Sequence, residues 1–101
     1  MVSKFDLKYT KFFERQWLGY DEKTQHLIQD KLGLIKQNPF RYDTLAGYRR
    51  VRKVKLSIEG KYQRLLYVLH LPKVNQILVL GVFEREKDYK DFERKFIQLK
   101  K

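Results

Sequence analysis

The sequence predicts an α+β fold in which helices pack on one face of a largely antiparallel, four-stranded sheet. Apolar residues alternate with charged ones near the start of the chain, and they recur at helical spacing between residues 21 and 38. Three strand-like segments separated by turn residues follow. The 101 residues, 43% hydrophobic and 15% aromatic, suit a single domain with one core. We therefore expect one domain, residues 1–101, with the element order β-α-α-β-β-β-α.

The first half of the chain predicts a strand and a helical hairpin. Residues 4–9 alternate between apolar and charged side chains, as in a strand with one buried face. Thr10 is expected to cap a first helix, which residues 18–20 break. Asp21 is expected to cap a second, antiparallel helix that ends at Asn38, before a proline. Its apolar residues recur at helical spacing: Leu27, Ile28, Leu32, Leu34 and Ile35.

The second half predicts a three-stranded meander and a last helix. Residues 40–48 form a loop anchored by Leu45. Strands are then expected at 49–58, 61–70 and 76–83. Glu59 and Gly60 form the first turn, because glycine tolerates a positive φ. From residue 85 the pattern becomes helical again, with Phe92, Phe96 and Leu99 on one side. The helical hairpin and this C-terminal helix would surround the sheet.

The positive charge is concentrated in one segment. The chain has 23 basic and 12 acidic residues and a net charge of +11, and residues 49–64 alone carry seven basic residues and one acidic residue. A focused basic patch on a folded domain indicates a nucleic acid or an acidic partner protein. The alternative is a generally basic, soluble protein whose charge serves no site.

The composition excludes several classes of site. With no cysteine, the chain has neither disulfides nor thiolate metal sites, which fits a cytoplasmic protein. No apolar run reaches the roughly 18 residues of a membrane span, and the N-terminus lacks a signal peptide's apolar stretch, so we expect no membrane association. Acidic residues are scattered, and His26 and His70 are far apart in sequence. We therefore expect no metal and no cofactor.

The turn determines which face carries the charges. If Glu59 and Gly60 are the two turn residues, Lys55 lies opposite Arg64, and Lys53 lies on the same face. The opposite face then collects the apolar residues Val54, Leu56, Leu65 and Tyr67 against the helices. A three-residue turn would move Arg64 to the other face. The charged face would be a phosphate-binding surface, or long side chains extending into water from an open sheet.

The chain resembles the RelE/ParE toxin superfamily, particularly its RelE-like ribosome-dependent mRNA endonucleases. Four stretches carry the resemblance: Leu45-Ala46-Gly47, Arg52-Lys53-Val54-Lys55-Leu56, Tyr62-Gln63-Arg64-Leu65-Leu66-Tyr67 and Arg85-Glu86-Lys87-Asp88-Tyr89. The resemblance implies the toxin of a type II toxin–antitoxin system. Such a toxin cleaves mRNA in the ribosomal A site by metal-independent attack of the 2′-OH, and so inhibits translation.

The resemblance also implies catalytic residues. Lys53 and Lys55 match the family's paired catalytic lysines, and Arg64 matches its central-strand arginine. Tyr89 matches the C-terminal tyrosine, and Arg85 the arginine one turn before it. Arg64 would clamp the scissile phosphate, Arg85 would support the leaving group, and either a lysine or Tyr89 would serve as base. The structural alternatives are core packing for Tyr89 and a surface salt bridge for Arg85.

Further positions would contact RNA without doing chemistry. We expect Arg49, Arg50, Arg52 and Lys61 to bind the RNA backbone, with a strong salt dependence. The expected partners are the ribosome with its mRNA and a cognate acidic antitoxin, which leaves room for a toxin–antitoxin hetero-oligomer.

Two departures from the family pattern keep other functions open. Gln63 is inserted in the Tyr-Arg motif, and Phe83 stands where some active members carry another catalytic arginine. The alternatives are a ParE-like poison of DNA gyrase and a nucleic-acid-binding protein without catalysis.

Overall fold

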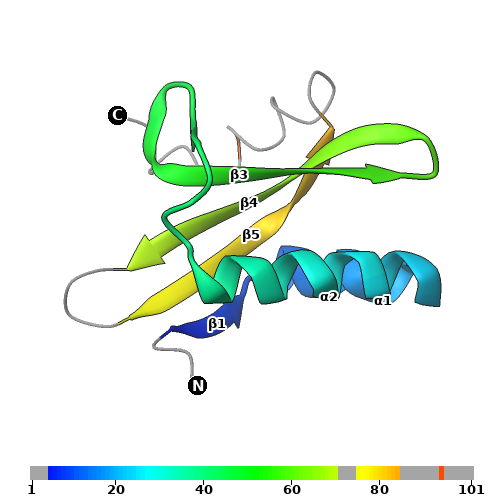
Figure 1. Ribbon diagram of the computed structural model, residues 1–101. Coiled ribbons are helices and arrows are strands. Elements are labelled where there is room, and N and C mark those ends of the chain that lie inside the picture. The colour runs from blue at the N-terminus through cyan, green and yellow to red at the C-terminus, as the bar shows by residue number, and fades with distance from the viewer. Residues whose placement is uncertain (1–4, 71–74, 85–93, 95–101) are drawn as a thin grey trace.

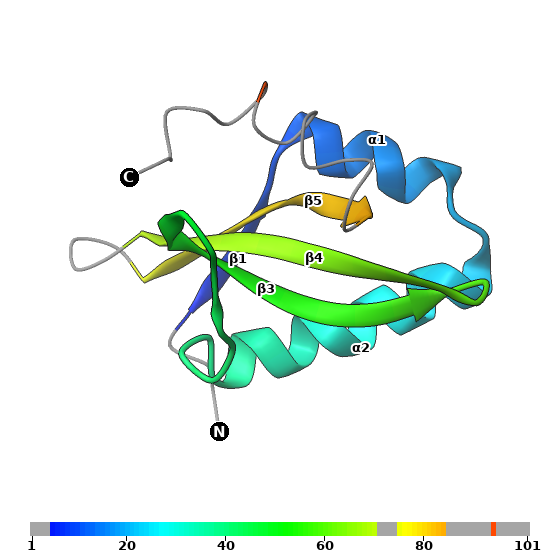
Figure 2. The ribbon, with the colours of Figure 1, turned by 90° about the horizontal axis from the view of Figure 1, so that it is seen from above.

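The computed structural model describes residues 5–70, 75–84 and Arg94 (Figure 1). The described elements are β1 (Asp6–Tyr9), α1 (Lys11–Gly19), α2 (Glu22–Gln37), β2 (Thr44–Leu45), β3 (Tyr48–Ile58), β4 (Lys61–His70) and β5 (Gln76–Glu84). Both helices lie on one side of the sheet (Figure 1). We call the sheet face toward the helices the inner face and the opposite one the outer face. In Figure 2 the outer face is toward the viewer, with α2 behind it.

The sheet confirms the predicted α+β class and differs from the expectation in its strand number. Its order is β1-β5-β4-β3-β2, with β1 parallel to β5 and every other pairing antiparallel. The expected four strands are joined by β2, a two-residue strand in the segment predicted as a loop. β2 was not predicted because two residues are too few to show the alternation of apolar and polar side chains that identifies a strand. The predicted C-terminal helix lies outside the described residues, apart from Arg94, which is helical and exposed.

The predicted helix boundaries are confirmed by their caps. Thr10 accepts the backbone N–H of Phe13 at 3.0 Å at the start of α1. Asp21 accepts the backbone N–H of Thr24 at 2.8 Å at the start of α2, and this backbone hydrogen bond lowers the pKa of the Asp21 carboxyl. α2 ends at Gln37, two residues before the proline.

One residue of the predicted apolar row on α2 does not face the sheet. Ile28, Leu32 and Ile35 are buried as expected, but Leu34 is 39% exposed. Leu34 follows Leu32 by two residues, which is about 200° around the helix. Its side chain therefore leaves the buried face.

Side chains of the α1 region continue the edge of β5 where β1 ends. β1 pairs with the first part of β5, and the Thr10 hydroxyl then donates to the carbonyl of Leu80 at 2.8 Å. The Gln16 amide both donates to and accepts from the backbone of Val82, each at 2.8 Å. The amide thus takes the place of a strand's peptide group. A side chain on Gly81, where φ is +154°, would meet the Phe12 ring at 2.8 Å, so this approach requires glycine.

The hairpin between β3 and β4 has the predicted two-residue turn. Glu59 has φ +51° and Gly60 has φ +79°. Positive φ at both positions is the type I′ arrangement, whose twist suits two neighbouring strands. Lys55 therefore lies opposite Arg64, and Val54 lies opposite Leu65, as the sequence predicts.

The two sheet faces both carry apolar clusters. The inner face holds the larger core, which includes the predicted residues Val54, Leu56, Leu65 and Tyr67 together with Ile77, Val79 and Val82. The outer face has a second cluster: Leu45, Tyr48, Val51, Leu66, Val68, Leu80 and Phe83. Only part of the outer face is therefore charged, and this second cluster was not expected from the sequence.

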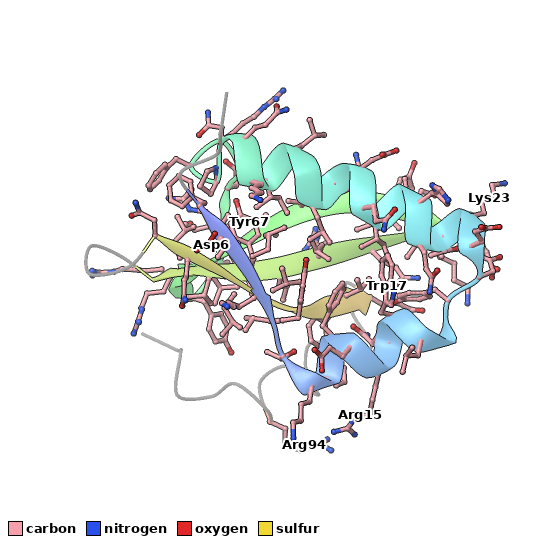
Figure 3. The ribbon with its side chains drawn as sticks, turned by 90° about the horizontal axis from the view of Figure 1, so that it is seen from below. Asp6, Arg15, Trp17, Lys23, Tyr67 and Arg94 are labelled. Carbon is pink, nitrogen blue, oxygen red and sulfur yellow. The ribbon has the colours of Figure 1, made fainter. Side chains whose placement is uncertain are left out.

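The segment after α2 is held to the inner face by two polar side chains of the sheet. The buried Tyr67 hydroxyl donates to the carbonyl of Pro39 at 2.6 Å, on the helix side of the sheet (Figure 3). Arg52 donates to the carbonyl of Tyr42 at 2.5 Å, and its guanidinium lies 5.7 Å from the centre of the Phe40 ring. Burial raises the pKa of the Tyr67 hydroxyl well above its ordinary value.

Tyr67→Phe should lower the free energy of unfolding by about 1–3 kcal/mol at neutral pH, because it leaves the buried Pro39 carbonyl without its donor. The pKa of Tyr67 is raised in the folded state, so its contribution is complete below the unfolded pKa of about 10 and declines as the pH rises above it. Urea titrations at neutral and alkaline pH should show the gap between the two proteins narrowing. A gap that stays constant or widens would contradict this role of the hydroxyl.

Candidate nucleic-acid interface

The centre of the basic surface is a pair of cations facing each other across β3 and β4. Lys55 and Arg64 are direct register partners on the outer face, which places their Cβ atoms about 5 Å apart. Lys55 is exposed and Arg64 is half-buried. Lys53 lies two residues before Lys55 on the same face, opposite the buried Leu66. The structure therefore brings together three of the five residues predicted to be catalytic.

Two hollows flank this cation pair and share Lys55. The first, of about 380 Å³, is lined by Lys55, Tyr62, Gln63 and Arg64. The second, of about 370 Å³, lies toward the segment after α2 and is lined by Lys31, Arg41, Tyr42, Asp43, Lys53, Val54 and Lys55. Four cations and a single carboxylate line the second hollow. Together the hollows extend the basic surface from the hairpin to the edge of β3.

Lys31 and Arg41 are part of the basic surface although the sequence did not predict them there. Lys31 comes from α2 and Arg41 from the following segment, so the fold brings them to β3 from a distance in the sequence. The backbone N–H of Lys53 donates to the carbonyl of Asp43 at 3.0 Å, which holds this segment against β3. No periodic pattern in the sequence could have indicated this contact.

On the other side of Arg64 the outer face is apolar. Phe83 is the register partner of Arg64 in β5, is 1% exposed and stacks on Phe12 with a centroid distance of 5.3 Å. Leu66, the next residue of β4 on this face, is fully buried. Arg64 thus lies between a cation and an apolar wall, and an apolar surrounding strengthens electrostatic interactions with a bound anion.

The remaining predicted site residues are not gathered at this pair. Arg49 and Arg50 are exposed at the start of β3. Arg52 faces inward and holds the segment at residues 40–42, as its position in the alternation implies. Lys61 is exposed at the turn, in a hollow with the acidic residues Asp21, Glu59 and Glu84. Arg85 and Tyr89 lie outside the described residues.

The helix side of the molecule offers different chemistry. A cavity of about 430 Å³ is lined by Tyr9, Phe13, Glu14, Trp17, Leu18, Gln29 and Leu32. Its lining contains a carboxylate and no cation, so it is unsuited to a phosphate. Among the described residues, no group of three or more His, Asp or Glu side chains could hold a metal ion. The helices that the structure describes are too short or too polar to span a membrane.

Comparisons with known proteins find similarity in structure. No model of a protein family matches the chain, and no curated protein matches its sequence. An arginine double mutant of the E. coli toxin RelE in the free state matches with a TM-score of 0.71 and 18% identity, over 94% of this chain and 99% of that one. One chain from each of two complexes, RelBE and RelE–RelB, matches with a lower TM-score.

The intact E. coli RelBE toxin–antitoxin complex matches with a TM-score of 0.66 and 21% identity, over 80% of this chain and 96% of that one. The archaeal RelE–RelB complex from Pyrococcus horikoshii matches with a TM-score of 0.54 and 16% identity, over 83% and 98% of the two chains. At these identities the similarity concerns the fold. The chain therefore has the RelE-like toxin fold that its sequence motifs predict.

Proposed function

We propose that this chain is the toxin of a type II toxin–antitoxin system, and that it inhibits translation by cutting mRNA in the ribosomal A site. The observation that carries the proposal is the Lys55–Arg64 pair on the outer face of a RelE-like fold, with Lys53 beside it. The resemblance of the four sequence stretches to RelE-like endonucleases supports the reaction and the ribosomal substrate.

In the proposed reaction, RNA supplies its own nucleophile, the 2′-OH next to the scissile phosphate. The enzyme has to remove the proton of this hydroxyl, stabilise charge on the pentacovalent phosphorus and protonate the leaving 5′-oxygen. Lysine and arginine side chains can provide this charge stabilisation without a bound metal. Lys53, Lys55 or Tyr89 acts as the base, and Arg85 supports the leaving group.

Arg64 has the central role in binding the phosphate. Its planar guanidinium can donate two parallel hydrogen bonds to phosphate oxygens, which a lysine cannot do. Lys55 approaches the same phosphate from the opposite strand. The apolar wall formed by Phe83 and Leu66 restricts water on one side of Arg64, which favours charge stabilisation in the transition state.

The RNA backbone continues along the edge of β3 in this proposal. Lys31 and Arg41 line the hollow beside Lys53, while Arg49 and Arg50 are exposed at the start of the strand. Each phosphate contact releases counterions, so the affinity for RNA should fall steeply as salt increases. Arg52 is left out of this set, because its guanidinium is bound to the segment at residues 40–42.

An acidic antitoxin is the proposed protein partner. The net charge of +11 favours an acidic surface on any partner that covers the basic face. Two of the structurally similar chains come from complexes of RelE with RelB, one of them named a toxin–antitoxin complex. An antitoxin over the outer face would neutralise the cations and block access of RNA to Arg64.

A second candidate function is RNA binding without cleavage. The observation that favours it is Phe83, which is buried against Phe12. By the family resemblance, some active members carry a catalytic arginine at this position. The chain would then bind RNA phosphates through Lys55 and Arg64 but lack one contribution to catalysis. The following experiment separates the two functions.

Purified chain added to translating ribosomes should cut mRNA within codons, as mapped by primer extension. Arg64→Ala should lower the single-turnover cleavage rate by about 100- to 1,000-fold, because it removes a preorganised donor to the charged transition state. Arg64→Lys should recover only part of the rate, since lysine keeps the charge but loses the two-pronged geometry.

Lys23→Ala is the matched control, because it removes one exposed cation from α2 on the helix side (Figure 3). It should cleave like the wild type. Salt-sensitive RNA binding with intact message would support the second candidate instead. In cells that express the chain, DNA damage with intact message would indicate a gyrase poison. In the ribosome assay, equal cleavage by wild type and Arg64→Ala would refute the site.

Lys55→Gln should change stability and function in opposite directions. It removes the like-charge repulsion with Arg64 across the strands, so the free energy of unfolding should rise by about 0.5 kcal/mol, more at low salt than at high salt. RNA cleavage should fall. Lys61→Gln, next to three acidic residues and opposite Ile58, should leave stability unchanged or slightly lower. Urea titrations at two salt concentrations measure the free energy of unfolding of the two variants. A lower free energy of unfolding for Lys55→Gln than for the wild type would contradict the repulsion.

A further inference from the structure

Tyr62 is an aromatic residue that the fold leaves in solvent. It is 82% exposed, the highest value among the exposed large apolar side chains of the described residues. Its register partner across the hairpin is Ser57, which is also exposed and too small to cover the ring. Phe40 is a useful contrast: it is 52% exposed, but its ring contacts Phe5 and the Arg52 guanidinium. Among the described residues Tyr62 has no such ring contact.

The hairpin register places Tyr62 beside the cation pair. Tyr62 and Arg64 are two residues apart on β4, so their side chains share the outer face about 7 Å apart along the strand. Both line the same hollow of about 380 Å³, with Lys55 on its other side. β5 ends at Glu84, which pairs with Gln63, so the described sheet does not extend past Tyr62 on that side. Within the described part of the chain, β5 therefore does not flank the ring.

We propose that Tyr62 is a stacking platform for one unpaired nucleobase of the RNA whose phosphate Lys55 and Arg64 bind. This inference rests on the proposed function, because it needs a phosphate at the cation pair. Tyr62 lies two residues from Arg64 along β4. When a phosphate is bound to Arg64, the base of the same or the adjoining nucleotide can therefore reach the Tyr62 ring. Stacking accepts any base, because each base has a π-face.

The arrangement selects for single-stranded RNA. A base inside a duplex is already stacked on its neighbours and cannot lie on Tyr62 as well. Basic side chains alone bind the backbone of single and double strands alike. An exposed ring next to a phosphate site therefore adds a preference for unpaired RNA to the general attraction by charge. Tyr62 also fixes where along the backbone the phosphate on Arg64 lies, and so acts as a positioning residue for cleavage.

The test measures binding of a short single-stranded RNA that contains the fluorescent base 2-aminopurine, without ribosomes. Tyr62→Phe should bind within about 2-fold of wild type, because the ring is kept. Tyr62→Leu keeps apolar bulk but loses the π-face, and it should bind about 5- to 100-fold more weakly. Stacking quenches 2-aminopurine, so the emission of the bound RNA should be low for the wild type and Tyr62→Phe and higher for Tyr62→Leu.

Two controls separate the ring from the charges and from folding. Duplex RNA of the same sequence should bind the wild type and Tyr62→Leu equally. Leu18→Ala, at an 80% exposed position on the helix side, should behave like wild type throughout. The slope of log affinity against log salt should be the same for all Tyr62 variants, whereas Lys55→Gln should reduce it by about 0.7, the value for one phosphate contact to a single strand.

The outcomes distinguish the stacking platform from the phosphate site. If Lys55→Gln lowers the slope but Tyr62→Leu binds single-stranded RNA with wild-type affinity and quenching, the platform is refuted while the phosphate site stands. If the wild type shows no salt-sensitive binding, or Lys55→Gln leaves the slope unchanged, the phosphate site fails, and the platform fails with it. An equal loss of single-stranded and duplex binding in Tyr62→Leu would also refute the platform.

Discussion

The two-residue turn at Glu59 and Gly60 is the constraint on which both surfaces of the sheet depend. Positive φ at the two positions closes the hairpin in one register, and that register determines the face of every side chain in β3 and β4. Val54 and Leu65 then meet against the helices, while Lys55 and Arg64 meet on the outer face. A shift by one residue would exchange the apolar core with the cations, so the same turn that specifies the fold also assembles the candidate site.

The outer face divides into a part that serves folding and a part that does not. Around Phe83 and Leu66 it is apolar and buried, with Phe12 of α1 stacked on Phe83. Toward the turn it carries the like-charged register partners Lys55 and Arg64 and the exposed Tyr62, and these residues do not stabilise the fold. Local choices that oppose stability are expected at functional sites, because elsewhere the sequence and fold agree. Their concentration next to one hollow is the physical basis for the RNA site.

Sequence reasoning succeeded where a local rule determines the outcome. The caps at Thr10 and Asp21 and the turn at Gly60 each depend on a few neighbouring residues, and all three are confirmed. It missed features that depend on contacts between distant segments. Examples are the two-residue strand β2, the second apolar cluster, and the approach of Lys31 and Arg41 to Lys53.

The predicted hairpin register already determines the faces of Arg52 and Tyr62. Arg52 was expected to bind RNA because of its charge, and Tyr62 was considered only as part of a family motif. The register places Arg52 on the inner face and Tyr62 beside Arg64. The basic residues of this segment therefore lie on both faces of the sheet, Arg52 on the inner face and Lys53 and Lys55 on the outer face. Arg85 and Tyr89 remain predictions, because their roles rest on the family resemblance and they lie outside the described residues. In the described residues the candidate site is formed by β3 and β4, with Lys53, Lys55 and Arg64 at its centre.

NMR would locate bound RNA most directly. In a titration of isotope-labelled protein with a short single-stranded RNA, the largest chemical-shift changes should fall on the strand residues Lys53, Lys55, Tyr62 and Arg64. The amide chemical shifts of Trp17 and Leu32, which line the cavity of about 430 Å³ on the helix side, should stay unchanged. Shift changes confined to that cavity, with the hairpin unaffected, would contradict an RNA site on the outer face.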